Sequence, residues 1–207
     1  MNEQPWRVLF LNPASQLGGA ERSLLSLVSR LNPRHFQTCV LLCVEGPLEG
    51  ELARLGISFH RLPFPKIALR VGRTSSLQNL FRLAIAFFAQ IPFWIRLIVF
   101  VRRGGFDLIH TNGVKSHLHG CLIKLFLRKR LVWHVRDIFA PGLFTVMLLV
   151  LGGLFPEAII ANSGATAQPF LQSRRTRRKI QVIYNGFDFS EWAPRSSRPE
   201  LESRLGL

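Results

Sequence analysis

The chain has 207 residues, of which 48% are apolar and 19% charged, so it can bury the core of one α/β domain but is too short for a second domain of similar size. With 27 Lys and Arg against 12 Asp and Glu, its net charge is +15. This composition excludes an intrinsically disordered chain, and three irregularly spaced cysteines exclude a disulfide framework or a cysteine-based metal site.

Short apolar runs alternate with helical stretches along the chain, the pattern of crossover units on a parallel sheet. The first helix, at residues 20–31, has leucines and a valine at helical spacing and ends at Asn32-Pro33. Strands are expected at residues 7–11, 38–44, 58–62, 107–110, 130–135, 158–161 and 181–184. We therefore predict an α/β fold with a Rossmann-like, doubly wound, mostly parallel sheet.

The loop at residues 12–21 follows the first predicted strand and opens the first predicted helix. In a doubly wound domain, such a loop presents ligands beyond the carboxyl end of a strand. Gly18 and Gly19 would let the backbone approach a phosphate, which the unpaired amides of the first helical turn can bind. The spacing matches neither the dinucleotide fingerprint nor a P-loop, and a plain glycine turn that opens a helix is the alternative.

Two apolar segments, residues 80–101 and 139–155, raise the question of membrane contact. The charge-free run in the first, residues 83–95, is shorter than the roughly 20 residues of a spanning helix. Proline and glycines at Pro141, Gly142, Gly152 and Gly153 interrupt the second. We expect crossover helices buried against the sheet, with interfacial contact or a spanning helix as the alternatives.

Positive charge is concentrated in two stretches. Residues 52–136 contain fifteen Lys or Arg and one acid, Asp107, and residues 174–179 contain five cations in six positions. Such a field attracts polyanions or anionic lipid, although a solvated basic surface is the plainer interpretation. No nucleic-acid-binding motif is present, so we expect no nucleic-acid partner. The N-terminus lacks the features of a signal peptide, which predicts a cytoplasmic protein. The basic and apolar stretches together suggest the hypothesis that it attaches peripherally at the inner face of the membrane.

Five blocks of sequence occur in a characteristic order. They are residues 18–24 (GGAERSL), 106–112 (FDLIHTN), 132–137 (VWHVRD), 159–163 (IIANS) and 182–188 (VIYNGFD). Together they resemble the N-terminal domain of family 4 glycosyltransferases of the GT-B fold. That family has two Rossmann-like domains facing across a cleft, the first binding mainly the acceptor and the second the nucleotide sugar. The resemblance implies transfer of a hexose-type sugar, with retention, to a glycan or lipid-linked acceptor, without metal or prosthetic group.

The resemblance also assigns residues. It places Gly18 and Gly19 near the donor diphosphate and makes His134 the candidate catalytic residue, at the transferred sugar. Asn185 and Gly186 would form the hinge between the domains. The remaining residues expected to line the donor and acceptor cleft are Glu21, Asn112, Lys115, Arg136 and Asp137.

Some of these side chains also have purely structural interpretations. His134 ends an apolar strand, where a histidine is often a hydrogen-bonded core residue. His110, at the end of another strand, is expected to pack rather than to contact a ligand. Ser163 lies between a strand and a helix, where capping explains it without a ligand, and Asn185-Gly186 is also a plain turn sequence.

The expected division of the chain is a domain at residues 1–188, followed at residues 189–207 by a linker and the start of a donor-binding domain. Because most groups that stabilise a leaving diphosphate would belong to that second domain, we expect no turnover by the 207-residue chain alone. One alternative is a split or non-catalytic acceptor-binding module that needs a C-terminal domain on another chain. A basic nucleic-acid-binding protein is the remaining alternative.

Overall fold

The structure is a computed structural model that describes residues 4–65 and 88–186. Within them, seven strands form one sheet in the order β3-β2-β1-β4-β5-β6-β7, with every neighbouring pair parallel. The strands are β1 (Trp6–Asn12), β2 (Phe36–Leu42), β3 (Phe59–Arg61), β4 (Leu108–Asn112), β5 (Arg130–Val135), β6 (Ala158–Ala161) and β7 (Ile180–Val182). The predicted α/β class and doubly wound sheet are confirmed.

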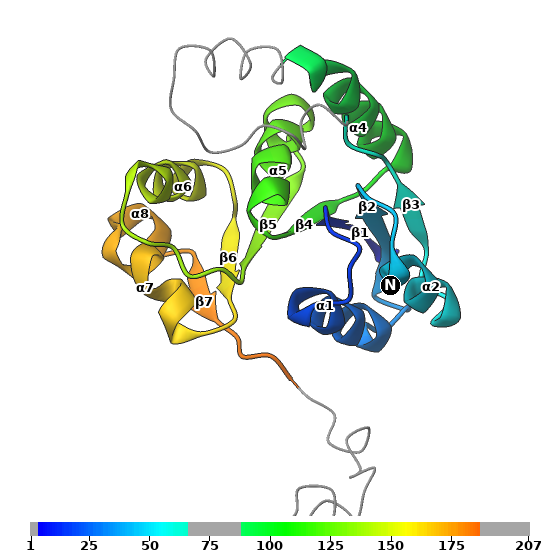
Figure 1. Cartoon of the computed structure of the whole chain (residues 1–207), viewed down its shortest axis with the longest axis horizontal. Helices are drawn as coiled ribbons and strands as arrows, with labels where there is room; N and C mark the ends of the chain where they lie inside the picture. The colour runs from blue at the N-terminus through cyan, green and yellow to red at the C-terminus, as the bar shows by residue number, and fades with distance from the viewer. Residues whose placement is uncertain (1–3, 66–87, 187–207) are drawn as a thin grey trace, which may run out of the picture.

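Helices cover both faces of the sheet, as Figure 1 shows for α1 and α2 on one side and α4 and α5 on the other. The helices α6, α7 and α8 gather beside β6 and β7. Their bounds are α1 (Gly19–Arg30), α2 (Pro47–Arg54), α4 (Ile91–Gly104), α5 (Val114–Leu127), α6 (Leu143–Leu154), α7 (Gly164–Gln172) and α8 (Arg174–Arg177). The result is a three-layer arrangement in which each helix connects or flanks parallel strands.

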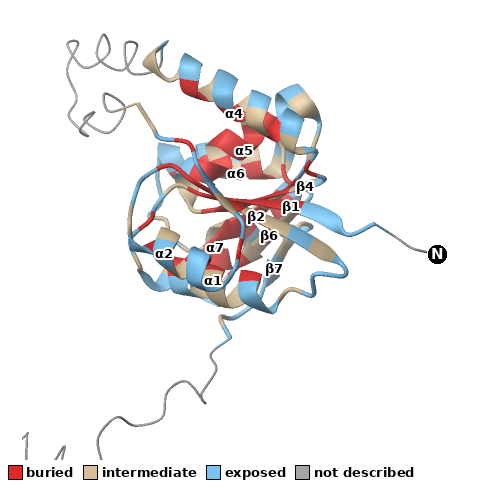
Figure 2. Ribbon diagram, turned by 90° about the vertical axis from the view of Figure 1, so that its right-hand side faces the viewer, coloured by how far each residue is buried: buried red, intermediate tan, exposed pale blue. Residues whose placement is uncertain are grey.

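The strands are apolar on both faces because each face has its own core. In β1, Val8 and Phe10 pack with α1 and α2, whereas Leu9 and Leu11 pack with α4 and α5. Alternate residues of a strand point to opposite faces, so a strand covered on both sides needs a continuous apolar run. Figure 2 shows the buried residues, in red, concentrated along the sheet and on the helices that face it.

The two apolar segments of the sequence become helices that lie against the sheet. Helix α4 buries Phe93, Leu97 and Val101, and α6 buries Leu148 and Gly152. Residues 80–87 of the first segment lie outside the described residues, as do residues 187–207, on which the predicted linker and the start of a second domain fall. Across residues 4–65 and 88–186, no helix combines the length and the apolar character required to cross a bilayer.

Candidate functional site

The direction in which the sheet grows reverses between β1 and β4. From β1 the chain adds β2 and then β3 on one side, and it returns to add β4, β5, β6 and β7 on the other. In open α/β sheets, such a switch point leaves a crevice at the carboxyl ends of the strands, where ligands bind. The carboxyl ends of β1 and β4 are Asn12 and Asn112, two buried polar residues that mark this place.

A chain of hydrogen bonds crosses the switch point. The Asn112 side-chain amide donates to Asn12 Oδ1 at 2.6 Å, and the Asn12 amide donates to the carbonyl of Ala14 at 2.7 Å. Arg136 Nε donates to Asn112 Oδ1 at 2.6 Å. Because buried polar groups cost free energy unless they are paired, these bonds hold the ends of β1 and β4 and the residue after β5 in one arrangement.

Arg136 is the centre of this network. Besides Asn112, its guanidinium donates to Asn185 Oδ1 at 3.2 Å and to His134 Nδ1 at 3.3 Å. Burial lowers the pKa of Arg136 to about 10, partly offset by the carboxylate of Glu21. The group is therefore still cationic at neutral pH, and it gives the switch point a fixed positive charge.

Arg136 also determines which nitrogen of His134 carries the proton. A guanidinium only donates hydrogen bonds, so Nδ1 of His134 must accept and Nε2 must carry the hydrogen. Burial, with the charge of Arg136 next, lowers the pKa of His134 to about 2, which makes the ring neutral. No group among the described residues accepts a hydrogen bond from His134 Nε2. The site thus presents one neutral, oriented hydrogen-bond donor.

The glycine loop lies at the start of α1. The backbone amide of Gly18 donates to Glu21 Oε2 at 3.2 Å, which fixes the loop against the first helical turn. A Cβ atom at Gly19 would meet nothing within 4 Å, so the backbone there is open to close approach. The first amides of a helix have no partner within the helix and carry partial positive charge, which suits an anion.

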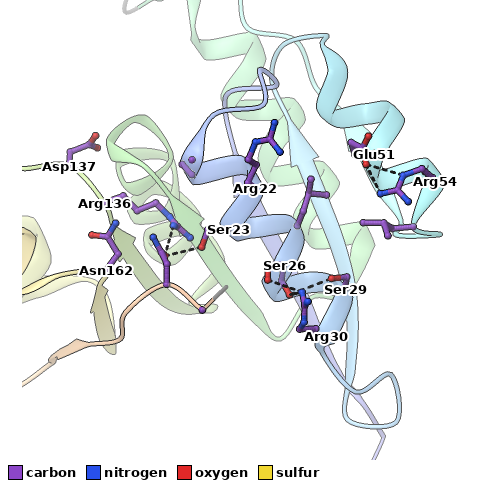
Figure 3. Close-up of a pocket in the computed structure, with 16 residues that line it drawn as sticks. Arg22, Ser23, Ser26, Ser29, Arg30, Glu51, Arg54, Arg136, Asp137 and Asn162 are labelled. Carbon is purple, nitrogen blue, oxygen red and sulfur yellow. Dashed lines mark hydrogen bonds and ion pairs between the residues drawn. The ribbon is translucent and has the colours of Figure 1, made fainter. Parts of the chain in front are cut away.

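A hollow of about 580 Å³ opens beside this network, as Figure 3 shows. In that view Arg136 and Ser23 point toward one another, and both donate to Asn185 Oδ1, Ser23 at 3.0 Å. Most of the other lining residues are polar, and three are apolar. The hollow is lined by Gly19, Arg22, Ser26, Ser29, Arg30, Glu51, Arg54, Asp137, Asn162 and Gly186, and by Ala20, Leu25 and Leu55. The polar side chains and the fixed cation in this hollow can bind a polar or anionic ligand.

The structure therefore brings together most of the residues predicted from sequence. Gly19, Arg136, Asp137, Asn185 and Gly186 line the hollow. Asn112 and His134 are bonded to Arg136, and Gly18 and Glu21 belong to the loop at the start of α1. The remaining candidate, Lys115, is exposed in the first turn of α5 and does not line the hollow.

The sequence offered structural roles for Ser163 and His110, and the structure shows the surroundings of both residues. The Ser163 side chain accepts a hydrogen bond from the amide of Thr166 at 3.2 Å, which confirms that it caps α7. His110 is buried, with its ring 4.8 Å from that of Phe10 and 5.4 Å from that of His134. Burial, together with the charge of Arg136, lowers the pKa of His110 to about 4, so it packs as a neutral ring.

Sequence reasoning missed Asn12 and Ser23 as parts of the network. Asn12 carried a signal, because a polar residue directly after the apolar run of β1 stands where a doubly wound sheet binds ligands. For Ser23 the only signal in the sequence is its place in the GGAERSL block, since its partner Asn185 is 162 residues away in the chain. Of the described residues, no three His, Cys, Asp or Glu side chains are grouped so that they could hold a metal ion.

The chain matches a known protein family and several solved structures. The sequence model of Glycosyltransferase Family 4 matches residues 17–191. The structure of HepE from Anabaena, in complex with UDP and glucose, is 25% identical with a TM-score of 0.71, covering 96% of this chain and 50% of that one. A glycosyltransferase from Rickettsia africae is 17% identical with a TM-score of 0.67, covering 99% and 49%.

MurG from Acinetobacter baumannii is a more distant structural match, 14% identical with a TM-score of 0.55, covering 92% of this chain and 48% of that one. At this identity and that of the Rickettsia protein, the likeness shows the fold alone. The chain spans about half the length of each of these structures. A comparison with curated protein sequences gives no significant match.

Proposed function

Because the chain belongs to glycosyltransferase family 4, we propose that it supplies the acceptor-side half of a retaining, nucleotide-sugar-dependent glycosyltransferase. The observation that carries this proposal is the Arg136 network at the switch point, where the family-matched segments converge on one hollow. The acceptor, a glycan or a lipid-linked sugar, would enter this hollow and meet the donor across it. Structures of HepE contain UDP and UDP-glucose, so a uridine diphosphate sugar is the donor to test first.

His134 would act by hydrogen bonding and not by proton transfer. Its pKa of about 2 makes the ring a very weak base at neutral pH. The oriented Nε2–H is suited to donate to a hydroxyl of the transferred sugar, and a sugar oxygen there would pair a donor that is otherwise buried without a partner. The amides at the start of α1 and the cation of Arg136 would favour the developing charge of the diphosphate.

We further propose that transfer needs a second Rossmann-like domain, located on the same longer polypeptide or on a partner chain. The chain spans about half the length of its structural relatives, and the family resemblance implies that the nucleotide-sugar groups belong to the other half. The half-length match also favours the second candidate, a split acceptor-binding module that works with a separate chain. The two arrangements share one chemistry and differ in where the second domain is encoded.

The test is UDP release from UDP-glucose in the presence of candidate acceptors. We expect none above background from the 207-residue chain, and release when the C-terminal half of HepE is joined after residue 188. In the joined protein His134→Ala should lower the rate roughly 5- to 30-fold, since one well-placed hydrogen bond is worth about 1–2 kcal/mol. The control is His60→Ala, which removes an exposed histidine of β3.

Two results would contradict the proposal. Turnover by the 207-residue chain alone would show that no second domain is needed. An unchanged rate for His134→Ala in an active joined protein would remove His134 from the site. Binding of nucleic acid that weakens steeply with salt, together with no response to any nucleotide sugar, would favour a basic nucleic-acid-binding protein instead.

A further inference from the structure

Helix α6 has an apolar face turned away from the sheet. Its inward side buries Thr145, Leu148 and Gly152. On the opposite side of the helix stand five apolar residues that are between 38% and 87% exposed: Leu143, Val146, Met147, Val150 and Leu154. A helix on the surface of a soluble domain normally carries polar residues there, whereas α6 contains no charged residue at all.

The apolar face continues toward the candidate site. Ile138, which is 73% exposed, lies between the end of β5 and the start of α6, and Phe144, which is 49% exposed, lies in the first turn of α6. Ile138 is two residues after Arg136, the centre of the hydrogen-bond network. The exposed apolar surface therefore begins beside the carboxyl edge of the sheet and runs along α6 away from it.

A cluster of cations flanks this apolar face. The short helix α8 and the residue after it carry four exposed arginines, Arg174, Arg175, Arg177 and Arg178. Helix α8 packs directly on α6, because a Cβ atom added at Gly153 would lie 3.0 Å from Cβ of Arg175. Figure 1 shows the two helices side by side at one end of the molecule. We call these four arginines and the exposed apolar residues from Ile138 to Leu154 the α6–α8 surface.

The neighbouring charged residues are already engaged elsewhere. Lys179 Nζ donates to the carbonyls of Gly153 and Pro156, both at 2.8 Å, so this lysine stabilises the end of α6. Glu157 is the only acid between residues 138 and 183, and it pairs with Lys124 and accepts from the amide of Leu131. The four arginines therefore face solvent without a competing carboxylate from this part of the chain.

We propose that the α6–α8 surface docks the protein on an anionic lipid bilayer. Apolar side chains would enter the boundary between headgroups and acyl chains, and the adjacent arginines would contact anionic headgroups. With 12 residues, α6 is about 18 Å long, too short to cross a hydrocarbon core of about 30 Å. Helix α6 therefore lies in the plane of the membrane surface.

Docking on a membrane also favours one class of acceptor. This conclusion about the acceptor rests on the proposed function. The apolar surface begins beside the candidate site, so a lipid-linked acceptor could keep its lipid in the bilayer while its polar head reaches the hollow. A water-soluble glycan would gain nothing from this arrangement. The membrane contact itself does not depend on the transfer reaction, and vesicle binding and UDP release measure the two separately.

The experiment is cosedimentation of the 207-residue chain with vesicles of phosphatidylcholine alone and with 30% phosphatidylglycerol. We expect binding to the anionic vesicles to exceed binding to the neutral ones by at least tenfold. Leu143→Glu, in the α6–α8 surface, should abolish most of this binding, whereas Leu125→Glu changes a similarly exposed leucine of α5 and should have little effect.

A second pair of variants tests the cations. The double change Arg174→Gln and Arg175→Gln should weaken anionic binding roughly tenfold or more. Arg102→Gln with Arg103→Gln removes an identical exposed pair from the last turn of α4 and serves as the matched control. Circular dichroism and thermal unfolding should be unchanged in all four variants, because every replaced side chain is exposed.

Three outcomes would overturn the proposal. Equal binding to neutral and anionic vesicles would exclude the role of the arginines. Loss of binding with the α4 pair and not with the α8 pair would place the contact elsewhere. A dimer in analytical ultracentrifugation that Leu143→Glu converts to monomer, with no vesicle binding by the unchanged chain, would make this surface an interface between copies.

Discussion

At the scale of single residues, Arg136 connects parts of the chain that are far apart in sequence. Its planar guanidinium reaches Asn112 at the end of β4, His134 at the end of β5 and Asn185 after β7. Lysine could not replace it, because an ammonium group lacks the fixed fork that directs several donors in one plane. The site is thus organised around one cation whose geometry matters as much as its charge.

The tautomer of His134 gives the first test at this scale. We expect NMR of histidine labelled with ¹⁵N to show hydrogen on Nε2 of His134 in the unchanged protein, because Arg136 donates to Nδ1. In Arg136→Met this preference should be lost. The control is Arg22→Met, which removes an exposed arginine from the same hollow without touching His134. Hydrogen on Nδ1 in the unchanged protein would contradict the arrangement.

Residues of the site differ in how far sequence could predict them. Asn112, His134 and Arg136 each stand at or just after the end of an apolar strand, so their common location at one sheet edge follows from a parallel arrangement. The bond between Arg136 and Asn185 could not be predicted, because it depends on where the chain turns after β7. Lys115 was predicted with them, yet its position on the first turn of α5 leaves it outside the hollow.

At the scale of elements, two glycines in helices have opposite roles. Gly120 lies in α5, where an added Cβ would come within 2.7 Å of both Leu131 Cδ1 and Thr111 Cγ2, so its absence lets the helix lie close to β4 and β5. Gly50 lies in α2 and has nothing within 4 Å of that position. Only the first glycine is required by packing.

These glycines make a matched pair of variants. Gly120→Ala should lower the free energy of unfolding by about 1–3 kcal/mol, because overpacking at a buried contact outweighs the better helix propensity of alanine. Gly50→Ala should raise it by roughly 0.5–1 kcal/mol, since only the propensity term acts there. Urea unfolding of both variants measures the difference. Equal stabilisation by the two changes would show that α5 has room for a methyl group.

The strands and α1 could be predicted from sequence to within two residues at each end, because buried parallel strands appear as uninterrupted apolar runs. The predicted strand at 38–44 begins two residues earlier in the structure, where Phe36 pairs with Trp6 in the register of β1 and β2. The exposed face of α6 could not be predicted. A helix that is apolar on every side gives no periodicity to indicate which side packs on the sheet.

At the scale of the whole molecule, four histidines are buried as neutral rings. Burial is the main cause that lowers the pKa of His110, His117, His119 and His134, to about 4, 3, 4 and 2. Like His110 and His134, the other two rings make specific contacts: His117 Nδ1 lies 2.7 Å from the hydroxyl of Thr111, and His119 packs against Phe93. Because unfolding lets these rings take up protons near pH 6.5, the stability of the whole fold is linked to pH.

The direction of this linkage follows from which state binds more protons. Below pH 6.5 the unfolded chain protonates these histidines while the folded chain keeps them neutral, so stability is complete above pH 6.5. It falls as the pH drops to 4, where His110 and His119 protonate in the folded state, and further toward 2 for His117 and His134. At pH 5.5 each ring contributes a loss of about 1.4 kcal/mol, or roughly 5.6 kcal/mol for the four. We expect urea unfolding to show this difference between pH 7.5 and 5.5. In His119→Gln the difference should shrink by about a quarter, whereas equal stability of the unchanged protein at the two pH values would mean that its histidines protonate without unfolding.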